Sequence, residues 1–308
     1  MSPSPSPEVR VPAALDAHLR RHAGASWADG LAELTSARLR VWGLRVRGPV
    51  LHGMVALVVP VWLPGGGRAV LKMQPLDAET AGEPVALRAW DGRGAVRLLD
   101  DDPGTGALLL EALDPERNLE RVDLDAALER VGGLLARLHA VPAPAGIRGL
   151  GEEARDLAGR ADHLSRTMGA ESGRARLVGL AARAREVSAE PGGALLHWDL
   201  HFANVLAPLP GAEREPWVAI DPKPLAGDGG FDLWPCLHNR WEEAVATGDP
   251  GREARRRMEL LAEAAGLERD RARAWTLVRV LQECVWALED GGHGLPPVPV
   301  AVAEALGA

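Results

Sequence analysis

The sequence predicts an α+β protein with two parts, a strand-rich part over residues 1–113 and a mostly helical part over residues 114–308. Between Arg38 and Leu110, short runs of alternating apolar and polar residues are separated by Gly/Pro turns, which is the pattern of strands. From Val122 onward, apolar residues recur at helical spacing over most of the chain. A chain of 308 residues is long enough to give each part a core of its own.

In the first part we expect two helices at 12–22 and 27–34, the former with Pro12 in its first turn. Three antiparallel strands follow as a meander. A helix ending at Trp90 and two further strands then complete a five-stranded antiparallel sheet with one helix. The five expected strands cover residues 39–47, 55–63, 69–73, 96–99 and 107–110.

Lys72 lies in the third of these strands, between apolar residues, in the run A-V-L-K-M. A lysine in such surroundings is partly buried and needs an anionic partner, either a carboxylate or a phosphate. Glu79 and Glu83 follow at a spacing of four, which would place both on one face of a helix. Pro84 is unusual inside a helix and indicates that the helix restarts there. Either glutamate is therefore a candidate partner.

The second part begins with a stripe of five apolar residues that predicts a long helix ending at His139. These residues are Leu124, Leu128, Val131, Leu135 and Leu138. Further helices are expected at 151–168, 173–189, 231–246, 250–265, 268–290 and 298–306.

The net charge of −8 is confined to the second part. Residues 1–113 carry 12 Lys/Arg and 12 Asp/Glu, whereas residues 114–308 carry 23 and 31. An acidic field disfavours nucleic acid as a partner and favours a cationic one. A solvated acidic surface without a partner explains the same charge equally well.

Several features favour a cytoplasmic protein without a membrane anchor or an obligate protein partner. No apolar run approaches the roughly 18 residues that a membrane span needs. The N-terminus lacks the basic and apolar regions of a secretory signal. Cys236 and Cys284, the two cysteines, lie in apolar helical surroundings and are expected to be reduced core thiols.

The stretch 195–221 concentrates polar side chains just after strand ends. An apolar strand ends at His197, with Asp199 two residues later and Asn204 five residues after that; a second apolar strand, 217–220, precedes Asp221. One interpretation is structural, with a histidine and an acid capping a turn. A second is a zinc site built from His197, Asp199 and His201, which lacks an evident further protein ligand.

The third interpretation is the catalytic loop of a kinase, in which Asp and Asn are five residues apart and His stands two before the Asp. Asp199 would orient the acceptor hydroxyl and take its proton. Asn204 and Asp221 would bind Mg²⁺ on the phosphates. Lys72 would hold the α- and β-phosphates of ATP. An upstream strand lysine and a second strand ending in Asp favour this interpretation.

With these motifs the chain resembles the aminoglycoside phosphotransferase family, and within it the aminoglycoside/hydroxyurea antibiotic-resistance kinases of the streptomycin 6-phosphotransferase branch. The matching motifs run nearly end to end. They are A-V-L-K at 69–72, L-R-A-W at 87–90, V-R-L-L-D at 96–100, L-H-A-V-P-A-P at 138–144, I-R-G-L-G at 147–151, L-H-W-D-L-H-F-A-N-V-L at 196–206, R-E-P-W-V-A-I-D-P-K-P at 214–224 and G-D-G-G-F-D-L-W-P at 227–235.

The resemblance implies a two-lobed protein-kinase-like fold that uses ATP and Mg²⁺, with His197 and Asp199 as catalytic residues. It makes Asp232 a brace for the catalytic loop and places Glu111–Leu113 where the backbone meets adenine. The turn at 47–53, including His52 and Gly53, would cover the phosphates, since the protein-kinase G-x-G-x-x-G pattern is missing.

The same resemblance implies a cationic aminoglycoside as acceptor, most closely the 6-hydroxyl of streptomycin, whose charge suits an acidic helical lobe. Alternatives are another small alcohol (an amino sugar, a nucleoside or hydroxyurea) or a pseudokinase, which the joint presence of Lys72, Asp199, Asn204 and Asp221 disfavours. Candidate acceptor residues are Asp228, Trp234, Asn239, Glu242, Glu283, Glu289 and Asp290.

Overall fold

The computed structural model describes residues 9–169 and 171–308, which form two compact units. Unit 1 holds the described residues up to Asp114 together with Pro208–Arg214, and unit 2 holds Pro115–Ala207 and Glu215–Ala308. The short segment Pro208–Arg214 belongs to unit 1 because its last residue is bound there. Arg214 pairs with the Glu111 carboxylate and donates from Nη2 to the carbonyl oxygen of Gly92 at 2.7 Å.

Unit 1 is built on a six-stranded antiparallel sheet with the order β1-β3-β4-β6-β5, and β2 pairs with the free part of β3. The expected sheet had five strands. The additional strand is β2, a two-residue strand just after the Gly48-Pro49 break. The six strands are β1 (Arg45–Val46), β2 (Leu51–His52), β3 (Leu57–Trp62), β4 (Arg68–Met73), β5 (Leu98–Asp102) and β6 (Ala107–Glu111).

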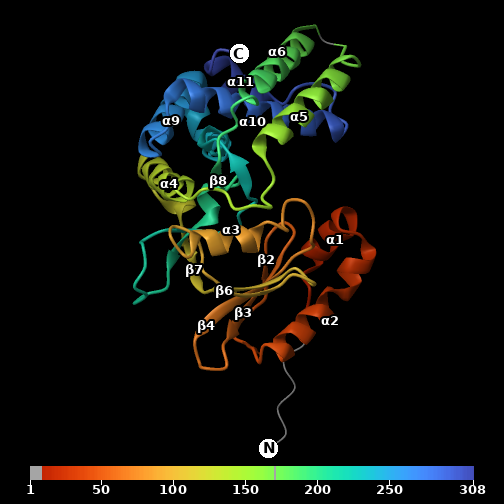
Figure 1. Ribbon diagram of the computed structural model, residues 1–308, viewed down its shortest axis with the longest axis vertical. Helices are drawn as coiled ribbons and strands as arrows, with labels where there is room; N and C mark the ends of the chain where they lie inside the picture. The colour runs from red at the N-terminus through yellow and green to blue at the C-terminus, as the bar shows by residue number, and fades with distance from the viewer. Residues whose placement is uncertain (1–8, 170) are drawn as a thin grey trace, which may run out of the picture. The chain divides into compact units, whose positions relative to one another are not determined.

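Helices α1 (Ala13–His22) and α2 (Ala25–Val41) cover one face of this sheet (Figure 1). Their buried leucines pack in one core with alternate residues of β3 and β4, since every second side chain of a strand faces the same way. The helix expected at 12–22 is confirmed. The core residues from the two strands are Leu57, Val59, Val61, Ala69, Leu71 and Met73.

The strand expected from residue 39 is wrong at its start, because α2 continues to Val41. The buried residues of α2 are Ala28, Leu31, Thr35 and Leu39, a stripe at helical spacing that continues past the expected helix end. Only Arg45–Val46 of the expected stretch pair as a strand, with Val61 and Trp62 of β3.

Helix α3 (Glu83–Trp90) begins at Glu83 with Pro84 in its first turn, one residue before the expected restart at Pro84. Glu79 lies in the turn before the helix, and the expectation that it shares a helical face with Glu83 is therefore wrong. Lys72 alternates with Leu71 and Met73 along β4, so it faces the side of the sheet opposite α1 and α2. Helix α3 lies on that side (Figure 1).

Unit 2 is mostly helical, and its long helix α10 is buried along much of its length. This helix packs against α5, α6, α9, α11 and the 3₁₀ segment η3. The expected helices at 124–139, 151–168, 173–189, 250–265, 268–290 and 298–306 are each found as one helix. The helices of unit 2 are α4 (Leu124–His139), α5 (Leu150–Ser165), α6 (Glu171–Val187), α7 (Trp234–His238), α8 (Trp241–Ala246), α9 (Pro250–Ala264), α10 (Arg269–Glu289) and α11 (Pro297–Ala305).

The single helix expected at 231–246 is wrong, because the chain there forms η3 (Gly229–Leu233), α7 and α8. The break between α7 and α8 falls at Asn239 and Arg240, and Arg240 adopts a left-handed conformation with φ 55°. Two contacts of the buried Arg257 hold the break, since its guanidinium donates to the carbonyl oxygens of Asn239 at 2.9 Å and Arg240 at 3.2 Å.

Short strands carry the polar stretch of unit 2. Strands β8 and β11 pair antiparallel, as do β9 and β10, and β9 also borders β7. Their bounds are β7 (Leu113–Asn118), β8 (Ala194–Leu196), β9 (Val205–Pro208), β10 (Val218–Ala219) and β11 (Leu225–Gly227), with η1 (Leu119–Arg121) and η2 (Phe202–Asn204) as 3₁₀ turns.

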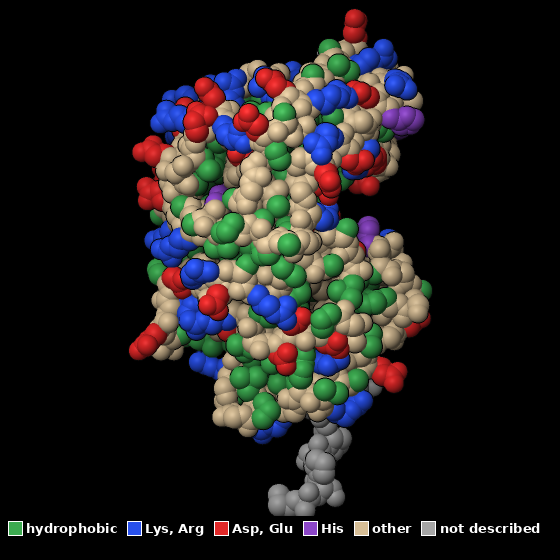
Figure 2. Space-filling model, viewed as in Figure 1, with side chains coloured by type: hydrophobic (Ala, Val, Ile, Leu, Met, Phe, Trp, Pro, Cys, Tyr) green, Lys and Arg blue, Asp and Glu red, His purple; other side chains and the backbone are tan. Residues whose placement is uncertain are grey.

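Acidic and basic side chains are interspersed over the helical unit on the face drawn in Figure 2. Ion pairs between acidic and basic side chains occur in this unit, among them Arg256 with Asp125 and Glu253, and Arg176 with Glu304. On that face the excess negative charge does not form a patch of one sign. Within the described residues, no helix combines the length and apolarity that a membrane span requires.

Candidate active site

The loop after β8 is held by the strand that pairs with it. Leu196 of β8 lies opposite Leu225 of β11, and the main-chain N–H of Lys223 donates to the carbonyl oxygen of His197 at 3.0 Å. The chain from Asp221 to Leu225 therefore runs beside His197, so Asp221 is brought close to the loop that carries Asp199.

Asp232 fixes the backbone immediately before Asp199. Its side chain is fully buried and accepts from the main-chain N–H of His197 at 2.9 Å and of Trp198 at 2.6 Å. His139 donates to the same carboxylate from Nε2 at 2.9 Å. Trp198 has φ 67°, a conformation that is costly for a bulky residue and persists only when its surroundings impose it. Asp232 is one such constraint.

The His197 ring connects the loop to the strand before Asp221. Nε2 donates to the carbonyl oxygen of Ile220 at 3.0 Å, and Nδ1 accepts from the N–H of Asp199 at 3.3 Å. Complete burial lowers the pKa of His197, although nearby Asp232, Asp199 and Asp221 act in the opposite direction. The ring is therefore a neutral imidazole whose two nitrogens contact backbone.

Asn204 and Asp221 are joined through the backbone at the ends of β9 and β10. The N–H of Ile220 donates to the carbonyl oxygen of Asn204 at 2.9 Å, and Asn204 Nδ2 donates to the carbonyl oxygen of Asp199 at 2.8 Å. Asp221 adopts a left-handed conformation, with φ 60°. The donation from Nδ2 directs the nitrogen of the amide toward the loop, so the side-chain oxygen is the atom of Asn204 that could bind a metal ion. An amide oxygen and a carboxylate suit Mg²⁺.

The zinc interpretation finds no support in this geometry. Both ring nitrogens of His197 contact backbone atoms. Over residues 9–169 and 171–308, no group of three or more His, Cys, Asp or Glu side chains is arranged to hold a metal ion.

In unit 1, Lys72 and Glu83 form a buried ion pair. Lys72 Nζ lies 2.8 Å from Oε1 and 2.7 Å from Oε2 of Glu83, and the two side chains are 7% and 1% exposed. Gln74 Nε2 also donates to Glu83 Oε2, at 2.6 Å. Of the two glutamates that the sequence left open, Glu83 is thus a partner of Lys72, and Gln74 is a contact that the sequence pattern did not indicate.

The remaining candidate nucleotide residues also lie in unit 1. His52 is exposed at the end of β2, and the N–H of Gly53 closes the following turn on the carbonyl oxygen of Ala56 at 2.9 Å. Glu111 ends β6, where its carboxylate accepts from the N–H of Arg97 at 2.7 Å; Leu113 is buried.

Asp228 and Glu289, two of the candidate acceptor residues, each form an ion pair with an arginine. Asp228 accepts from the N–H of Gly230 at 2.9 Å, capping η3, and pairs with Arg271 at 2.5 Å. Glu289 binds Arg160 Nε at 2.9 Å. These contacts occupy the two carboxylates.

Two other candidate acceptor residues have neighbours that were not predicted from the sequence. These neighbours are His238 beside Trp234 and Arg279 beside Glu283. Trp234 is buried and stacks on His238, with ring centroids 4.9 Å apart. Neither Trp234 Nε1 nor Asn239 Oδ1 has a hydrogen-bond partner among the described residues, although both atoms are buried. Glu283 pairs with Arg279. Glu242 and Asp290 are exposed.

Arg279 is a buried cation surrounded by aromatic rings. Its guanidinium carbon lies 5.8 Å from the ring centroid of Trp198, 5.8 Å from that of Phe231 and 5.1 Å from that of Trp286. Burial lowers its pKa, and Glu283 opposes this effect. An arginine within the apolar run V-R-V-L of α10 was the signal that could have identified it.

Lys223 is the second cation that the sequence reasoning missed. Its Nζ lies 3.3 Å from Oδ2 of Asp199. The available signal was composition, since only Lys72 and Lys223 of the 35 basic residues are lysines.

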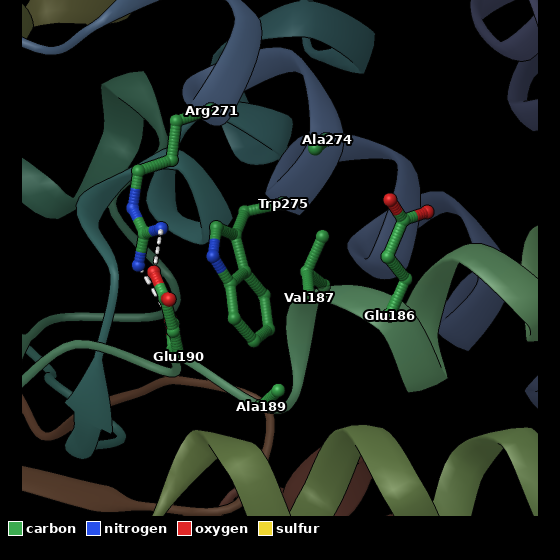
Figure 3. A pocket seen from close by; sticks show the side chains of 7 residues that line it. All are labelled: Glu186, Val187, Ala189, Glu190, Arg271, Ala274 and Trp275. Atoms are coloured by element: carbon green, nitrogen blue, oxygen red, sulfur yellow. Dashed lines mark hydrogen bonds and ion pairs between the residues drawn. The ribbon is translucent and has the colours of Figure 1, made fainter.

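A pocket of about 270 Å³ lies between the end of α6 and the first half of α10 (Figure 3). None of the seven residues that line it was predicted to bind substrate or cofactor. They are Glu186, Val187, Ala189, Glu190, Arg271, Ala274 and Trp275.

Comparison with known proteins shows which family the sequence matches. Residues 41–291 match the family described as aminoglycoside/hydroxyurea antibiotic resistance kinase. A hydroxyurea phosphotransferase of Kitasatospora aureofaciens is 52% identical over 97% of this chain and 86% of its own length. A streptomycin 6-kinase of Streptomyces griseus is 47% identical over 98% of this chain and 99% of its own.

The solved structure of the macrolide 2′-phosphotransferase MphH from Brachybacterium faecium superposes with a TM-score of 0.55. The alignment covers 91% of this chain and 98% of the other, at 21% identity. At that identity the likeness shows the fold alone, which is that of protein-kinase-like small-molecule kinases.

Proposed function

Because the chain belongs to the aminoglycoside/hydroxyurea antibiotic resistance kinase family, we propose that it transfers the γ-phosphoryl group of ATP to a hydroxyl of a cationic aminoglycoside, streptomycin in the first instance. The observation that carries this proposal is the arrangement in unit 2. There Asp199, Asn204 and Asp221 are tied together by hydrogen bonds through His197 and Ile220.

Asp199 is the proposed base. Its carboxylate orients the acceptor hydroxyl and accepts its proton while the oxygen attacks the γ-phosphorus. The new O–P bond forms as the bond from phosphorus to the β-phosphate oxygen breaks, and the electron pair leaves with ADP. His197 positions this base, since its buried neutral ring contacts backbone atoms and leaves no nitrogen directed to substrate.

Asn204 and Asp221 are the proposed ligands of Mg²⁺, which when bound neutralises the charge on the β- and γ-phosphates. The backbone contact between Ile220 and Asn204 holds the main chain next to Asp221 against that of Asn204. Asp232 supports the same loop by accepting from two successive N–H groups.

In unit 1, Lys72 is proposed to bind the α- and β-phosphates, with Glu83 and Gln74 holding its ammonium in place. A lysine buried to 7% exposure needs such a partner to stay charged. The turn with His52 and Gly53 is the proposed phosphate cover, and the backbone at Glu111–Leu113 the proposed contact to adenine. Buried, unpaired Cys236 and Cys284 suit a cytoplasmic enzyme with access to ATP.

For the acceptor we propose the surroundings of Glu283, Trp234 and Asn239. Glu283 supplies negative charge for a guanidinium or an amine, and the buried unpaired atoms of Trp234 and Asn239 supply a donor and an acceptor. Glu242 and Asp290 are exposed and are proposed to contribute less to acceptor binding. Asp228 and Glu289 are proposed to have structural roles, through their ion pairs with Arg271 and Arg160.

Hydroxyurea is the second candidate acceptor. The observation in its favour is the 52% identity to a hydroxyurea phosphotransferase, compared with 47% to a streptomycin 6-kinase. Hydroxyurea is small and uncharged, so it would not use the negative charge of Glu283.

An acceptor panel tests the proposal. ADP release is measured with ATP and, in turn, streptomycin, another aminoglycoside, hydroxyurea and a simple sugar. Streptomycin should stimulate release. Stimulation by hydroxyurea alone would replace the acceptor and keep the kinase. Without stimulation by any hydroxyl compound, the protein would be a nucleotide-binding pseudokinase.

The Asp199→Asn variant tests the site itself. It keeps the shape of the side chain but cannot accept the proton, so turnover should fall by a factor on the order of 10²–10⁴. ATP binding should persist, because Lys72 and Glu83 are unchanged. Unaltered turnover in this variant would show that the assigned base is wrong.

A further inference from the structure

Lys223 lies beside Asp199, the proposed base of the catalytic loop. Its Nζ lies 3.3 Å from Asp199 Oδ2, and the two side chains are 34% and 27% exposed. Because both side chains are partly exposed, the ammonium lies where the Asp199 carboxylate is accessible to solvent or substrate. Under the proposed function, this is the place where the acceptor hydroxyl attacks.

The backbone fixes the position of this ammonium. Lys223 donates its main-chain N–H to the carbonyl oxygen of His197 at 3.0 Å, two residues before Asp199. Pro222 and Pro224 flank it, and both are buried. Because proline fixes φ near −65°, the segment between β10 and β11 has little freedom to move the lysine away from the loop.

Composition gives an independent argument. The chain has 35 basic residues, of which 33 are arginine and two are lysine, Lys72 and Lys223. Almost every basic residue of the chain is therefore an arginine. Lys72 is the proposed phosphate-binding residue, where a compact ammonium differs in function from a planar guanidinium. The other lysine is the one that contacts the proposed base.

We propose that Lys223 is a catalytic residue that contacts the transferred phosphoryl group from its position beside Asp199. This inference rests on the proposed function. In the resting protein the ammonium holds Oδ2 of Asp199, so that the other oxygen faces the acceptor hydroxyl. During transfer, negative charge on the phosphoryl oxygens arrives beside the same carboxylate, and the ammonium stabilises that charge.

The step needs no further reactant. The acceptor proton goes to Asp199, the acceptor oxygen bonds to phosphorus, and the bond to ADP breaks with its electron pair. Lys223 keeps its proton throughout and acts by charge. Because its contact with the phosphoryl group strengthens in the transition state, its loss should lower kcat more than it raises KM.

The test compares Lys223→Met and Lys223→Arg with the parent enzyme, using ATP and whichever of streptomycin and hydroxyurea turns over. Lys223→Met should lower kcat by a factor of about 10²–10³, with each KM changed by less than about threefold. Lys223→Arg should recover only part of this loss, because the guanidinium is larger and planar. Arg269→Met, at an exposed cation on α10, is the matched control and should leave kcat unchanged.

Chemical rescue separates a catalytic charge from a structural contact. Lys223→Cys, treated with 2-bromoethylamine, regains an ammonium at nearly the lysine position, and kcat should return to within about tenfold of the parent. Cys236 and Cys284 are buried, and burial raises the pKa of both thiols, that of Cys284 to about 12, so the reagent selects residue 223. Treated parent enzyme serves as the control.

The two proposals fail in different ways. If Asp199→Asn lowers turnover as expected while Lys223→Met retains the parent kcat, the role of Lys223 is overturned and the kinase assignment stands. If Lys223→Met is inactive but the aminoethylated Lys223→Cys enzyme stays inactive while folded by circular dichroism, the charge is not what matters and the inference is also overturned. Turnover unaffected by Asp199→Asn would instead overturn the proposed site.

Discussion

The ring of His197 donates from Nε2 to the carbonyl oxygen of Ile220 at 3.0 Å while its Nδ1 accepts from the N–H of Asp199 at 3.3 Å. A single buried imidazole thus joins the loop carrying the proposed base to the strand that precedes Asp221. This arrangement requires the neutral form, because a protonated Nδ1 could not accept from Asp199.

We therefore expect acid to destabilise the protein through His197. Burial holds its pKa below the ordinary value of 6.5, so the unfolded chain binds a proton that the folded chain does not. The contribution of neutral His197 to the free energy of unfolding is complete above pH 6.5 and is lost as the pH falls below that value. The free energy of unfolding then changes by at most about 1.4 kcal/mol per pH unit through this residue. Urea unfolding measured between pH 7.5 and 5.5 gives the slope.

The His197→Gln variant should show a smaller slope than the parent over this range, whereas replacing exposed His293 by Gln should leave it as it was. His238, whose pKa burial also lowers, remains in every variant and contributes equally. If His197→Gln unfolds, the His197 resonances in the parent give the answer. Titration at pH 6.5 or above would contradict the prediction.

The buried pair of Lys72 and Glu83 gives a prediction for unit 1. Glu83→Gln keeps the side-chain shape but removes the negative charge that the buried Lys72 ammonium contacts, and breaking a buried pair of this kind costs roughly 3–5 kcal/mol. We expect a lower melting temperature and weaker ATP binding, measured by calorimetry. Glu33→Gln, at an exposed position on α2, is the control. Equal ATP affinity in parent and Glu83→Gln enzymes would argue against the assigned role.

The sequence indicated the groups whose geometry is local. Asp199 and Asn204 are five residues apart in one loop, and His197 and Asp221 each follow a short apolar strand, so spacing and strand ends were sufficient to find them. The partner of Lys72 stayed open because Pro84 obscured where α3 begins. Once the helix starts at Glu83, its first side chain contacts Lys72.

Groups that meet only through tertiary packing left no periodic signal. Arg279 contacts Trp198 across 81 positions of the chain, and Lys223 reaches Asp199 across 24. The extension of α2 was missed for another reason. Alternation in L-R-V-W fits a strand locally, whereas the buried stripe that ends at Leu39 depends on the sheet face that the helix covers.

Glu283 should distinguish the two acceptors. Glu283→Gln removes the negative charge proposed to bind a guanidinium or an amine, so KM for streptomycin should rise by about tenfold or more, a loss of about 1.4 kcal/mol. KM for ATP should not change. Glu304→Gln removes a more exposed carboxylate that also pairs with an arginine, and should leave both values as in the parent. Initial rates of ADP release provide both constants.

An unchanged KM for streptomycin in Glu283→Gln would place the acceptor away from this residue. If hydroxyurea is the acceptor, its KM should be insensitive to the charge. Because Arg279 loses its partner in this variant, the melting temperature is measured in parallel, so that a fall in stability is not mistaken for a loss of binding.

Substitution of Gly230 tests whether the catalytic loop depends on the close packing of η3 against α10. A Cβ on Gly230 would lie 2.5 Å from Cα and 2.7 Å from the carbonyl oxygen of Ala272, both backbone atoms that a side-chain rotation cannot move. The Thr276 hydroxyl also donates to the carbonyl oxygen of Gly230, at 2.9 Å. Gly230→Ala should therefore push η3 from α10 and cost about 1–3 kcal/mol.

The same displacement moves Asp232, two residues on, away from the N–H groups of His197 and Trp198, so kcat should fall together with stability. Gly159→Ala is the matched control. A Cβ there meets no atom within 4 Å on the exposed side of α5, and the change should stabilise the helix by about 0.5–1 kcal/mol without affecting kcat. Urea unfolding and initial rates measure both effects. If Gly230→Ala retained the parent stability and kcat, the close packing of η3 on α10 would not be what holds Asp232 in place.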